Sequence, residues 1–207
     1  MLLRFAGLGD DLFVNTIAYH LWKQEGRKVL VAGSHPELFR GNPGALIIPT
    51  RSQKVAHQIG RLLMKLRLIK AMTYMGYQPE ENGGGMRPID SHIFEVLAKK
   101  VGLKNAPKKP EIFLTKHEKR CFALPSGSKP WIAMHSTGIT EMTDNKNWYP
   151  ERFMEVSIKL RNTCRVVQLG RASDPSLEVD LDLRGKIRPR EAAAVLASCS
   201  GLVCQVG

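Results

Sequence analysis

The sequence Gly7-Leu8-Gly9-Asp10-Asp11 lies between an apolar run over residues 2–6 and a helical pattern over residues 12–25. This order predicts a buried strand, a glycine turn and a helix start, which is where open α/β sheets bind ligands. Gly7 and Gly9 allow a close backbone approach that a Cβ would block. Asp10 falls at the predicted helix N-terminus, where a carboxylate either serves only as a cap for free N–H groups or also faces a ligand.

The composition indicates a folded, basic protein. The chain has 207 residues, 43% of them hydrophobic, and 31 Lys and Arg against 19 Asp and Glu give a net charge of +12. Such a charge favours an anionic partner: a nucleic acid, an acidic lipid headgroup or a phosphorylated substrate. Aromatic residues make up only 7% of the chain, which argues against a surface for stacking bases. We therefore expect no nucleic-acid partner.

Four cysteines without a CxxC pair indicate free thiols in a reducing compartment. The sequence begins directly with a predicted strand, without the basic and apolar regions of a signal peptide. No apolar run approaches the roughly 18 residues that span a membrane. We expect a cytoplasmic protein.

The first half reads as an α/β domain over residues 1–120. Apolar runs at residues 2–6 and 28–32 flank a helical pattern, which predicts two parallel strands joined by a helix. Further strands are predicted at residues 45–48 and 111–114, and a further helix at residues 93–101.

A basic helix is predicted over residues 52–69. Its apolar residues, including Val55, Leu62 and Leu66, recur at helical spacing, while Lys54, Arg61 and Lys65 share another face. No acidic residue occurs from residue 51 to 79. The helix either contacts phosphorylated groups or an anionic membrane surface, or packs on the core with a solvated basic side.

A second α/β series is predicted over residues 128–207, after a connection at residues 116–130. The chain ends directly after a predicted buried strand, so we expect this second domain to be incomplete, or a partner to complete its sheet. The predicted strands span residues 131–135, 165–169, 179–183 and 202–206, and the predicted helices span residues 150–161 and 190–197.

Three stretches together resemble the bacterial heptosyltransferases of glycosyltransferase family 9. The first is the Gly7–Asp10 turn after the first strand. The second is His135-Ser136-Thr137-Gly138 followed by Lys146-Asn147-Trp148-Tyr149-Pro150, and the third is Asp182-Leu183-Arg184-Gly185-Lys186 followed by the helix at residues 190–197. The resemblance implies the GT-B architecture of two Rossmann-like α/β/α domains, with the second domain incomplete here.

The resemblance also implies an activity. Family members transfer a sugar, typically heptose, from an ADP-activated donor to a lipopolysaccharide-type acceptor, with inversion and without a metal or cofactor. It implies that the partners are a nucleotide-sugar and a glycolipid or glycan, with peripheral contact at the anionic inner membrane as a further expectation.

The family match places the general base at Asp10. A carboxylate that faces an acceptor hydroxyl can take its proton in the transition state. Because Asp11 is adjacent, it stays open as the alternative carboxylate. We expect acceptor binding at Gly9 and at the basic helix residues Lys54, Arg61 and Lys65.

The donor site is expected in the second domain. The loop Ser136, Thr137 and Gly138 resembles the family's diphosphate loop, and Lys146 matches the lysine that neutralises the donor phosphates. Ile187 either packs against the base or belongs to the core. The remaining donor residues expected from the match are Gly170, Arg171, Gln205 and Gly207.

The last strand departs from the family pattern. Family members usually carry Asp-Ser/Thr-Gly after this strand, whereas this chain has Gln205-Val206-Gly207. This difference keeps a second hypothesis open, a non-catalytic module that binds a nucleotide or an anionic glycan. A third hypothesis, nucleic-acid binding, rests on the net charge alone, because the sequence has no recognition-helix or aromatic-platform pattern.

Overall fold

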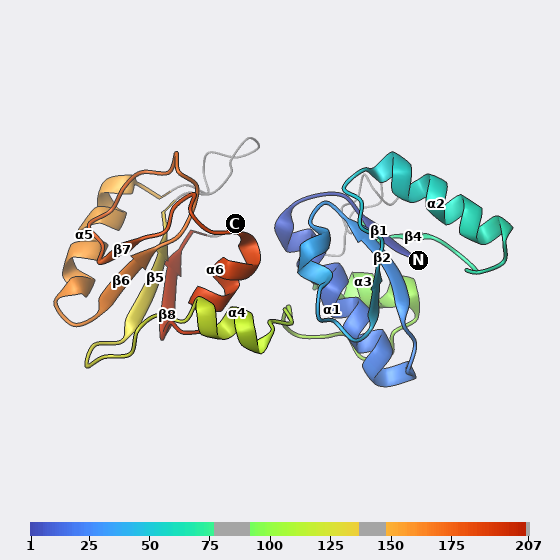
Figure 1. Ribbon diagram of the computed structural model, residues 1–207, viewed down its shortest axis with the longest axis horizontal. Coiled ribbons are helices and arrows are strands. Elements are labelled where there is room, and N and C mark those ends of the chain that lie inside the picture. The colour runs from blue at the N-terminus through green and yellow to red at the C-terminus, as the bar shows by residue number, and fades with distance from the viewer. Residues whose placement is uncertain (77–91, 137–147, 206–207) are drawn as a thin grey trace. The chain divides into compact units, whose positions relative to one another are not determined.

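The computed structural model describes residues 1–76, 92–136 and 148–205 (Figure 1). The chain divides into two compact units, Met1–Phe113 and Leu114–Gly207. We expected the first domain to extend to residue 120. Each unit contains one four-stranded parallel sheet with helices against it.

The sheet of the first unit has the strand order β3-β2-β1-β4. From β1 the chain moves outward to β2 and β3, and it then returns to the opposite side of β1 to form β4. The topological switch point, where ligands bind in open α/β sheets, therefore lies between β1 and β4. The strands are β1 (Leu2–Arg4), β2 (Val29–Gly33), β3 (Ala45–Ile47) and β4 (Thr73–Tyr74), all parallel to their neighbours.

Helices cover both faces of this sheet, because neighbouring strand residues point to opposite sides. Leu2 and Val31 join the apolar cluster of α1 (Leu8–Glu25) and α3 (Ile93–Val101). Leu3 and Ala32 join a second cluster with Ala56 of α2 (Gln53–Lys65). A short 3-10 helix, η1 (Pro36–Phe39), follows β2.

The second unit repeats this strand order as β7-β6-β5-β8, so its switch point lies between β5 and β8. Ala133 of β5 packs in a cluster with Val195 of α6, and Met134 packs on the other face with Phe153 of α5. The elements are α4 (Lys116–Cys121), β5 (Trp131–His135), α5 (Pro150–Arg161), β6 (Arg165–Gln168), β7 (Leu181–Asp182), α6 (Pro189–Leu196) and β8 (Gly201–Cys204).

The predicted strand at residues 111–114 is wrong. The Glu111 N–H donates to Thr16 Oγ1 at 2.8 Å, and the Glu111 carbonyl accepts from Asn15 Nδ2 at 2.9 Å. Side chains of α1 thus satisfy this backbone, and no strand pairs with it. The strand that pairs with β1 at the edge of the sheet is the two-residue β4, which the sequence analysis missed.

The predicted connection at residues 116–130 contains the helix α4. Thr115 and Glu118 cap its first turn, since Thr115 Oγ1 accepts from the Glu118 N–H and the Glu118 carboxylate accepts from the Thr115 N–H. The buried Arg190 of α6 donates to Glu118 at 2.6 and 2.7 Å. These contacts bind α4 to the second unit.

Candidate functional site

The Gly7 turn brings Asp10 back toward the strand that precedes it. Arg4, the last residue of β1, donates to Asp10 Oδ1 through Nη2 at 2.8 Å and through Nε at 3.2 Å. The Gly7 N–H donates to Asp10 Oδ2 at 2.9 Å. The Asp10 side chain is 14% exposed and that of Arg4 is 4% exposed. Asp10 therefore does cap α1, and it also forms an ion pair that the sequence analysis missed.

Arg4 also connects the two strands at the switch point of the first unit. Its guanidinium lies 5.7 Å from the ring centroid of Tyr74, the last residue of β4. A cation at this distance is attracted to the face of an aromatic ring. The carboxyl ends of β1 and β4 thus carry a connected group of polar side chains.

Asp11 lies in the protein interior with no exposed surface. Its Oδ2 accepts two hydrogen bonds of 2.8 Å from His35, one from the backbone N–H and one from Nδ1. Burial raises the pKa of Asp11 to about 6, although the His35 hydrogen bonds act in the opposite direction. Because Asp11 is enclosed, it cannot meet an acceptor hydroxyl directly, and Asp10 is the more accessible of the two carboxylates.

The basic helix α2 packs through small residues. Ala56 and Gly60 are buried, and the side chain of Met72 lies directly against Gly60. Of the two alternatives, packing on the core does not apply to the large apolar residues Val55, Leu62 and Leu66, which are 41%, 56% and 58% exposed. The absence of a side chain at Gly60 allows this close approach.

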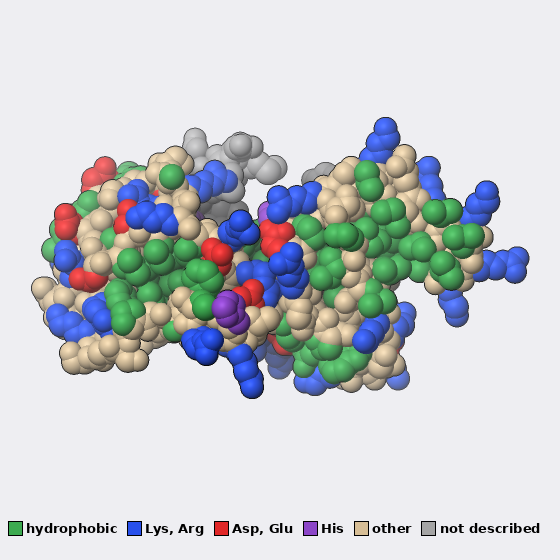
Figure 2. All heavy atoms as spheres, in the orientation of Figure 1, with side chains coloured by type: hydrophobic (Ala, Val, Ile, Leu, Met, Phe, Trp, Pro, Cys, Tyr) green, Lys and Arg blue, Asp and Glu red, His purple; other side chains and the backbone are tan. Residues whose placement is uncertain are grey.

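The surface over α2 therefore combines apolar and basic side chains (Figure 2). Met64 and Leu68 extend the exposed apolar group at the C-terminal end of the helix. Lys54, Arg61 and Lys65 are exposed beside it. Contiguous exposed apolar residues on a soluble protein mark interaction sites.

The switch point of the second unit lies between Ser136, which follows β5, and Gln205, which follows β8. Ser136 is 1% exposed, and its carbonyl accepts a hydrogen bond from Gln205 Nε2. In the described part of the chain, no hydrogen-bond partner is present for the buried Gln205 Oε1. Four other expected donor residues lie outside the described residues: Thr137, Gly138, Lys146 and Gly207.

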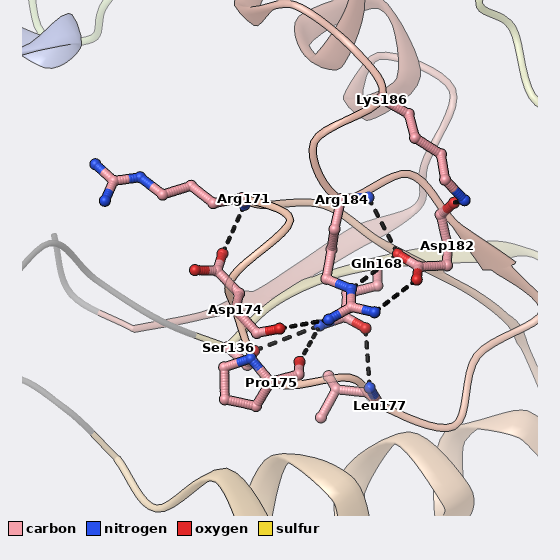
Figure 3. Close-up of polar contacts among 9 residues, drawn as sticks. All are labelled: Ser136, Gln168, Arg171, Asp174, Pro175, Leu177, Asp182, Arg184 and Lys186. Carbon is pink, nitrogen blue, oxygen red and sulfur yellow. Dashed lines mark hydrogen bonds and ion pairs between the residues drawn. The ribbon is translucent and has the colours of Figure 1, made fainter.

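Asp174 holds the loop that follows β6. Gly170 has a φ of +135°, and a Cβ at this position would lie 2.3 Å from Asp174 Oδ2. The same oxygen accepts the Arg171 N–H at 2.7 Å. The Arg171 side chain points away from this contact (Figure 3) and is exposed. The loop is thus fixed through the Arg171 backbone, while its guanidinium is accessible to a ligand.

A buried amide supports the same loop. Gln168 Oε1 accepts the Leu177 N–H at 3.0 Å, and Gln168 Nε2 donates to the Pro175 carbonyl at 2.7 Å and to Ser136 Oγ at 3.5 Å (Figure 3). Gln168 therefore ties the loop after β6 to the donor residue Ser136. Neither Gln168 nor Asp174 was expected from the sequence. Gln168 lies within an apolar run that predicts only a strand, and Asp174 belongs to none of the motifs.

Asp182 and Arg184 of the third motif form an ion pair. Arg184 Nε and Nη2 donate to the two Asp182 oxygens at 2.9 and 2.7 Å. The Arg184 hydrogen bond is the main cause that lowers the pKa of Asp182 to about 2. Arg184 also donates to the Asp174 carbonyl (Figure 3). Arg184 therefore connects Asp182, the last residue of β7, to the loop that follows β6.

Ile187 is half-buried and packs against the cluster that contains Trp131 and Val195. Of its two expected roles, the core role is the one with contacts in the structure.

The described residues contain no group of three or more His, Cys, Asp and Glu side chains that could hold a metal ion. Among the helices of the described part, none has the length and apolar character needed to cross a membrane.

No family model and no curated protein matches the sequence. Solved structures do match the fold. E. coli ADP-heptose lps heptosyltransferase II is 16% identical with a TM-score of 0.65, over 99% of this chain and 78% of that one. A glycosyl transferase of family 9 from Veillonella parvula DSM 2008 is 12% identical with a TM-score of 0.69, over 98% and 74%.

E. coli heptosyltransferase WaaC, solved with ADP-2-deoxy-2-fluoro heptose, is 14% identical with a TM-score of 0.58, over 99% of this chain and 82% of that one. These likenesses define the class of fold: two parallel α/β sheets of the heptosyltransferase type. The predicted α/β fold and its resemblance to family 9 glycosyltransferases are thereby confirmed at the level of fold.

Proposed function

We propose that this protein is a glycosyltransferase that moves a sugar from an ADP-activated donor, with heptose as the sugar, to a lipopolysaccharide-type acceptor. The observation that carries the proposal is that this fold has polar side chains at the switch point of each of its two sheets. The first unit presents the Asp10 carboxylate, which pairs with Arg4 at the end of β1. The second unit presents a buried serine and an exposed arginine beside the ends of β5 and β6.

In the proposed reaction, the acceptor oxygen attacks the anomeric carbon while the bond to the donor diphosphate breaks. The configuration inverts, and the nucleoside diphosphate leaves with the bonding electrons. Asp10 accepts the hydroxyl proton as general base. Arg4 holds the Asp10 carboxylate in one orientation, so it serves as a positioning residue.

Diphosphate binding is assigned to the second unit. The proposed contacts are hydroxyl and backbone groups of Ser136, Thr137 and Gly138, with Lys146 supplying a cation for the leaving group. Because the chain's own cations would neutralise the diphosphate, the proposal requires neither a metal nor a cofactor. Further donor contacts are proposed at Gly170, Arg171, Gln205 and Gly207, with Ile187 in its supporting core.

The acceptor is proposed to meet the first unit at Gly9 and along α2. Lys54, Arg61 and Lys65 offer charge for acceptor phosphates, and the exposed apolar residues beside them suit the headgroup region of an anionic bilayer. We place this contact on the cytoplasmic side of the inner membrane, where the free cysteines of the chain remain reduced.

Release of ADP from ADP-heptose in the presence of heptose-free lipopolysaccharide tests the proposal. We expect turnover by the wild type and a loss of about 100-fold or more in Asp10→Asn, because the amide cannot accept the proton. Calorimetry should show unchanged donor affinity in the variant. Glu155→Gln, which alters an exposed ion pair on α5, is the control for surface charge. Equal turnover by the wild type and Asp10→Asn would exclude Asp10 as the base.

A non-catalytic binding module is the second candidate. It is favoured by Gln205, because the family that this chain resembles carries an acidic residue at this position. The Oε1 atom of Gln205 is buried. Donor binding in calorimetry without ADP release in any acceptor mixture would support this candidate over the transferase.

A further inference from the structure

His35 and Asp11 form a pair that the proposed mechanism does not use. His35 follows β2 directly after Ser34, at the carboxyl edge of the first sheet. Its backbone N–H and its Nδ1 both lie 2.8 Å from Asp11 Oδ2. Two contacts to one oxygen fix the residue at both its backbone and its ring.

This contact also sets the hydrogen positions on the imidazole. An ionised carboxylate only accepts hydrogen bonds, so Nδ1 carries the hydrogen in the pair. In the neutral ring the lone pair is then on Nε2. Within the described residues, nothing bonds to Nε2. The His35 side chain is 30% exposed, whereas that of Asp11 is fully enclosed. A buried carboxylate therefore presents a partly exposed imidazole with one acceptor nitrogen.

The position of His35 is close in the fold to the Gly7 turn. β2 pairs with β1 in parallel, with Gly33 beside Arg4 in the register. The segment that contains His35 thus leaves the sheet beside the strand end that carries Asp10. A neutral imidazole nitrogen at such an edge is suited to a hydroxyl group, which donates to it.

We propose that His35 Nε2 binds a hydroxyl of the acceptor sugar and that Asp11 positions the ring for this contact. The proposal rests on the proposed function and adds a residue that determines acceptor affinity. Asp10 remains the general base, so His35 orients the acceptor without taking its proton in the reaction.

The expected effect is confined to the acceptor. Loss of one hydrogen bond of about 1.4 kcal/mol corresponds to a tenfold weaker interaction. We therefore expect His35→Gln to raise the acceptor KM about tenfold and to leave the KM for ADP-heptose unchanged. Asp11→Asn should shift the acceptor KM in the same direction, because it removes the charge that holds the Nδ1–H form.

A matched control is His20→Gln. His20 also pairs with a carboxylate of the first unit, Glu111, at 3.1 Å, but it lies far along α1 from the Gly7 turn. We expect its acceptor KM to equal that of the wild type. An unchanged acceptor KM in His35→Gln, or an equal rise in His20→Gln, would overturn the proposal.

A measurement without turnover separates this inference from the proposed function. Nitrogen-15 NMR of the histidine rings should show the Nδ1–H form for His35, and a shift of Nε2 on addition of heptose-free lipopolysaccharide. If the wild type binds this probe through Nε2 but releases no ADP, the transferase proposal fails and the His35 contact stands. Absence of the Nε2 shift, or an Nε2–H form, overturns the His35 proposal whatever the turnover.

Discussion

Arg4 and Asp10 are joined across the Gly7 turn, with Arg4 Nη2 2.8 Å from Asp10 Oδ1. The last residue of the first strand thereby holds the first turn of the following helix. The carboxylate proposed as base is fixed in place by a nearly buried cation, so its orientation depends on the strand end.

Replacement of Arg4 by Gln should therefore affect both stability and turnover. Loss of one partner from a nearly buried ion pair costs about 3 kcal/mol, and we expect the free energy of unfolding to fall by that amount. Turnover should fall at least tenfold because Asp10 loses its orientation. Urea denaturation and ADP release measure the two effects.

The comparison variant is Arg152→Gln, which breaks the ion pair with Glu155. Both side chains of that pair are more than half exposed, at 58% and 51%, so we expect a change of less than about 0.5 kcal/mol. An Arg4→Gln variant as stable as Arg152→Gln would show that the pair contributes little.

Asp11 should make stability fall as pH rises. Its pKa is raised from 3.8 to about 6 by burial, so the folded state binds the proton more tightly than the unfolded state. The stabilisation from the protonated form is complete below pH 4 and is lost by about pH 6.5. The shift corresponds to about 3 kcal/mol at most.

Asp11→Asn removes this titration. The difference in unfolding free energy, variant minus wild type, should increase between pH 4 and pH 6.5 when both are measured by urea denaturation. A difference that does not change with pH would mean that Asp11 has an ordinary pKa in the folded state.

Gly33→Ala should destabilise the first unit. A Cβ at Gly33 would lie 2.1 Å from Asp11 Oδ1 and 2.9 Å from the Arg4 carbonyl, which forces the strand or the carboxylate to move. We expect a loss of about 2 kcal/mol in thermal or chemical unfolding. Gly9→Ala is the control for stability, since nothing lies within 4 Å of the added atom. It should be neutral or more stable, and similar losses in both variants would contradict the steric argument.

Glu118→Gln should weaken the attachment of α4 to α6. The hydrogen bonds from Arg190 are the main cause that lowers the pKa of Glu118 to about 2, so the pair stabilises the folded state at neutral pH. That contribution is present above pH 4.5 and is lost as pH falls toward 2. We expect a loss of about 2 kcal/mol at pH 7 that shrinks at pH 3. A loss of equal size at both pH values would point to a packing defect.

Charge reversal on α2 should reduce binding to anionic vesicles. The triple variant Lys54→Glu, Arg61→Glu, Lys65→Glu should lose most sedimentation with vesicles that contain one third phosphatidylglycerol, while donor affinity in calorimetry stays the same. The triple reversal of Lys116, Lys119 and Arg120 on α4 changes the net charge equally. If both variants lose binding equally, the effect is due to net charge alone and α2 is not the contact.

Most elements of the fold could be predicted from the sequence, because the pattern of apolar residues marks each buried strand and helix. The exceptions depend on partners that are distant along the chain. The basic sequence of α4 resembles a linker, and the Arg190 that secures it lies 72 positions from Glu118. The two residues of β4 are too few to show alternation.

In the candidate site too, local features could be predicted from the sequence and contacts between distant residues could not. The position of Asp10 at the start of the helix and its role as a cap could be predicted from the neighbouring residues of the glycine turn. Its pairing with Arg4 required the geometry of the turn, and the contact between Asp11 and His35 required the register of β1 and β2. The apolar spacing of α2 did not identify the buried residues, which are the small Ala56 and Gly60 and not the large apolar side chains.

The hydrogen bonds between Glu118 and Arg190 determine where an expressed fragment of the second unit should begin. A fragment that begins at residue 121 would lack the carboxylate that Arg190 contacts in the intact chain, together with most of α4. A fragment that starts at Leu114 retains Thr115 and Glu118, and so it keeps α4 and its contact with α6.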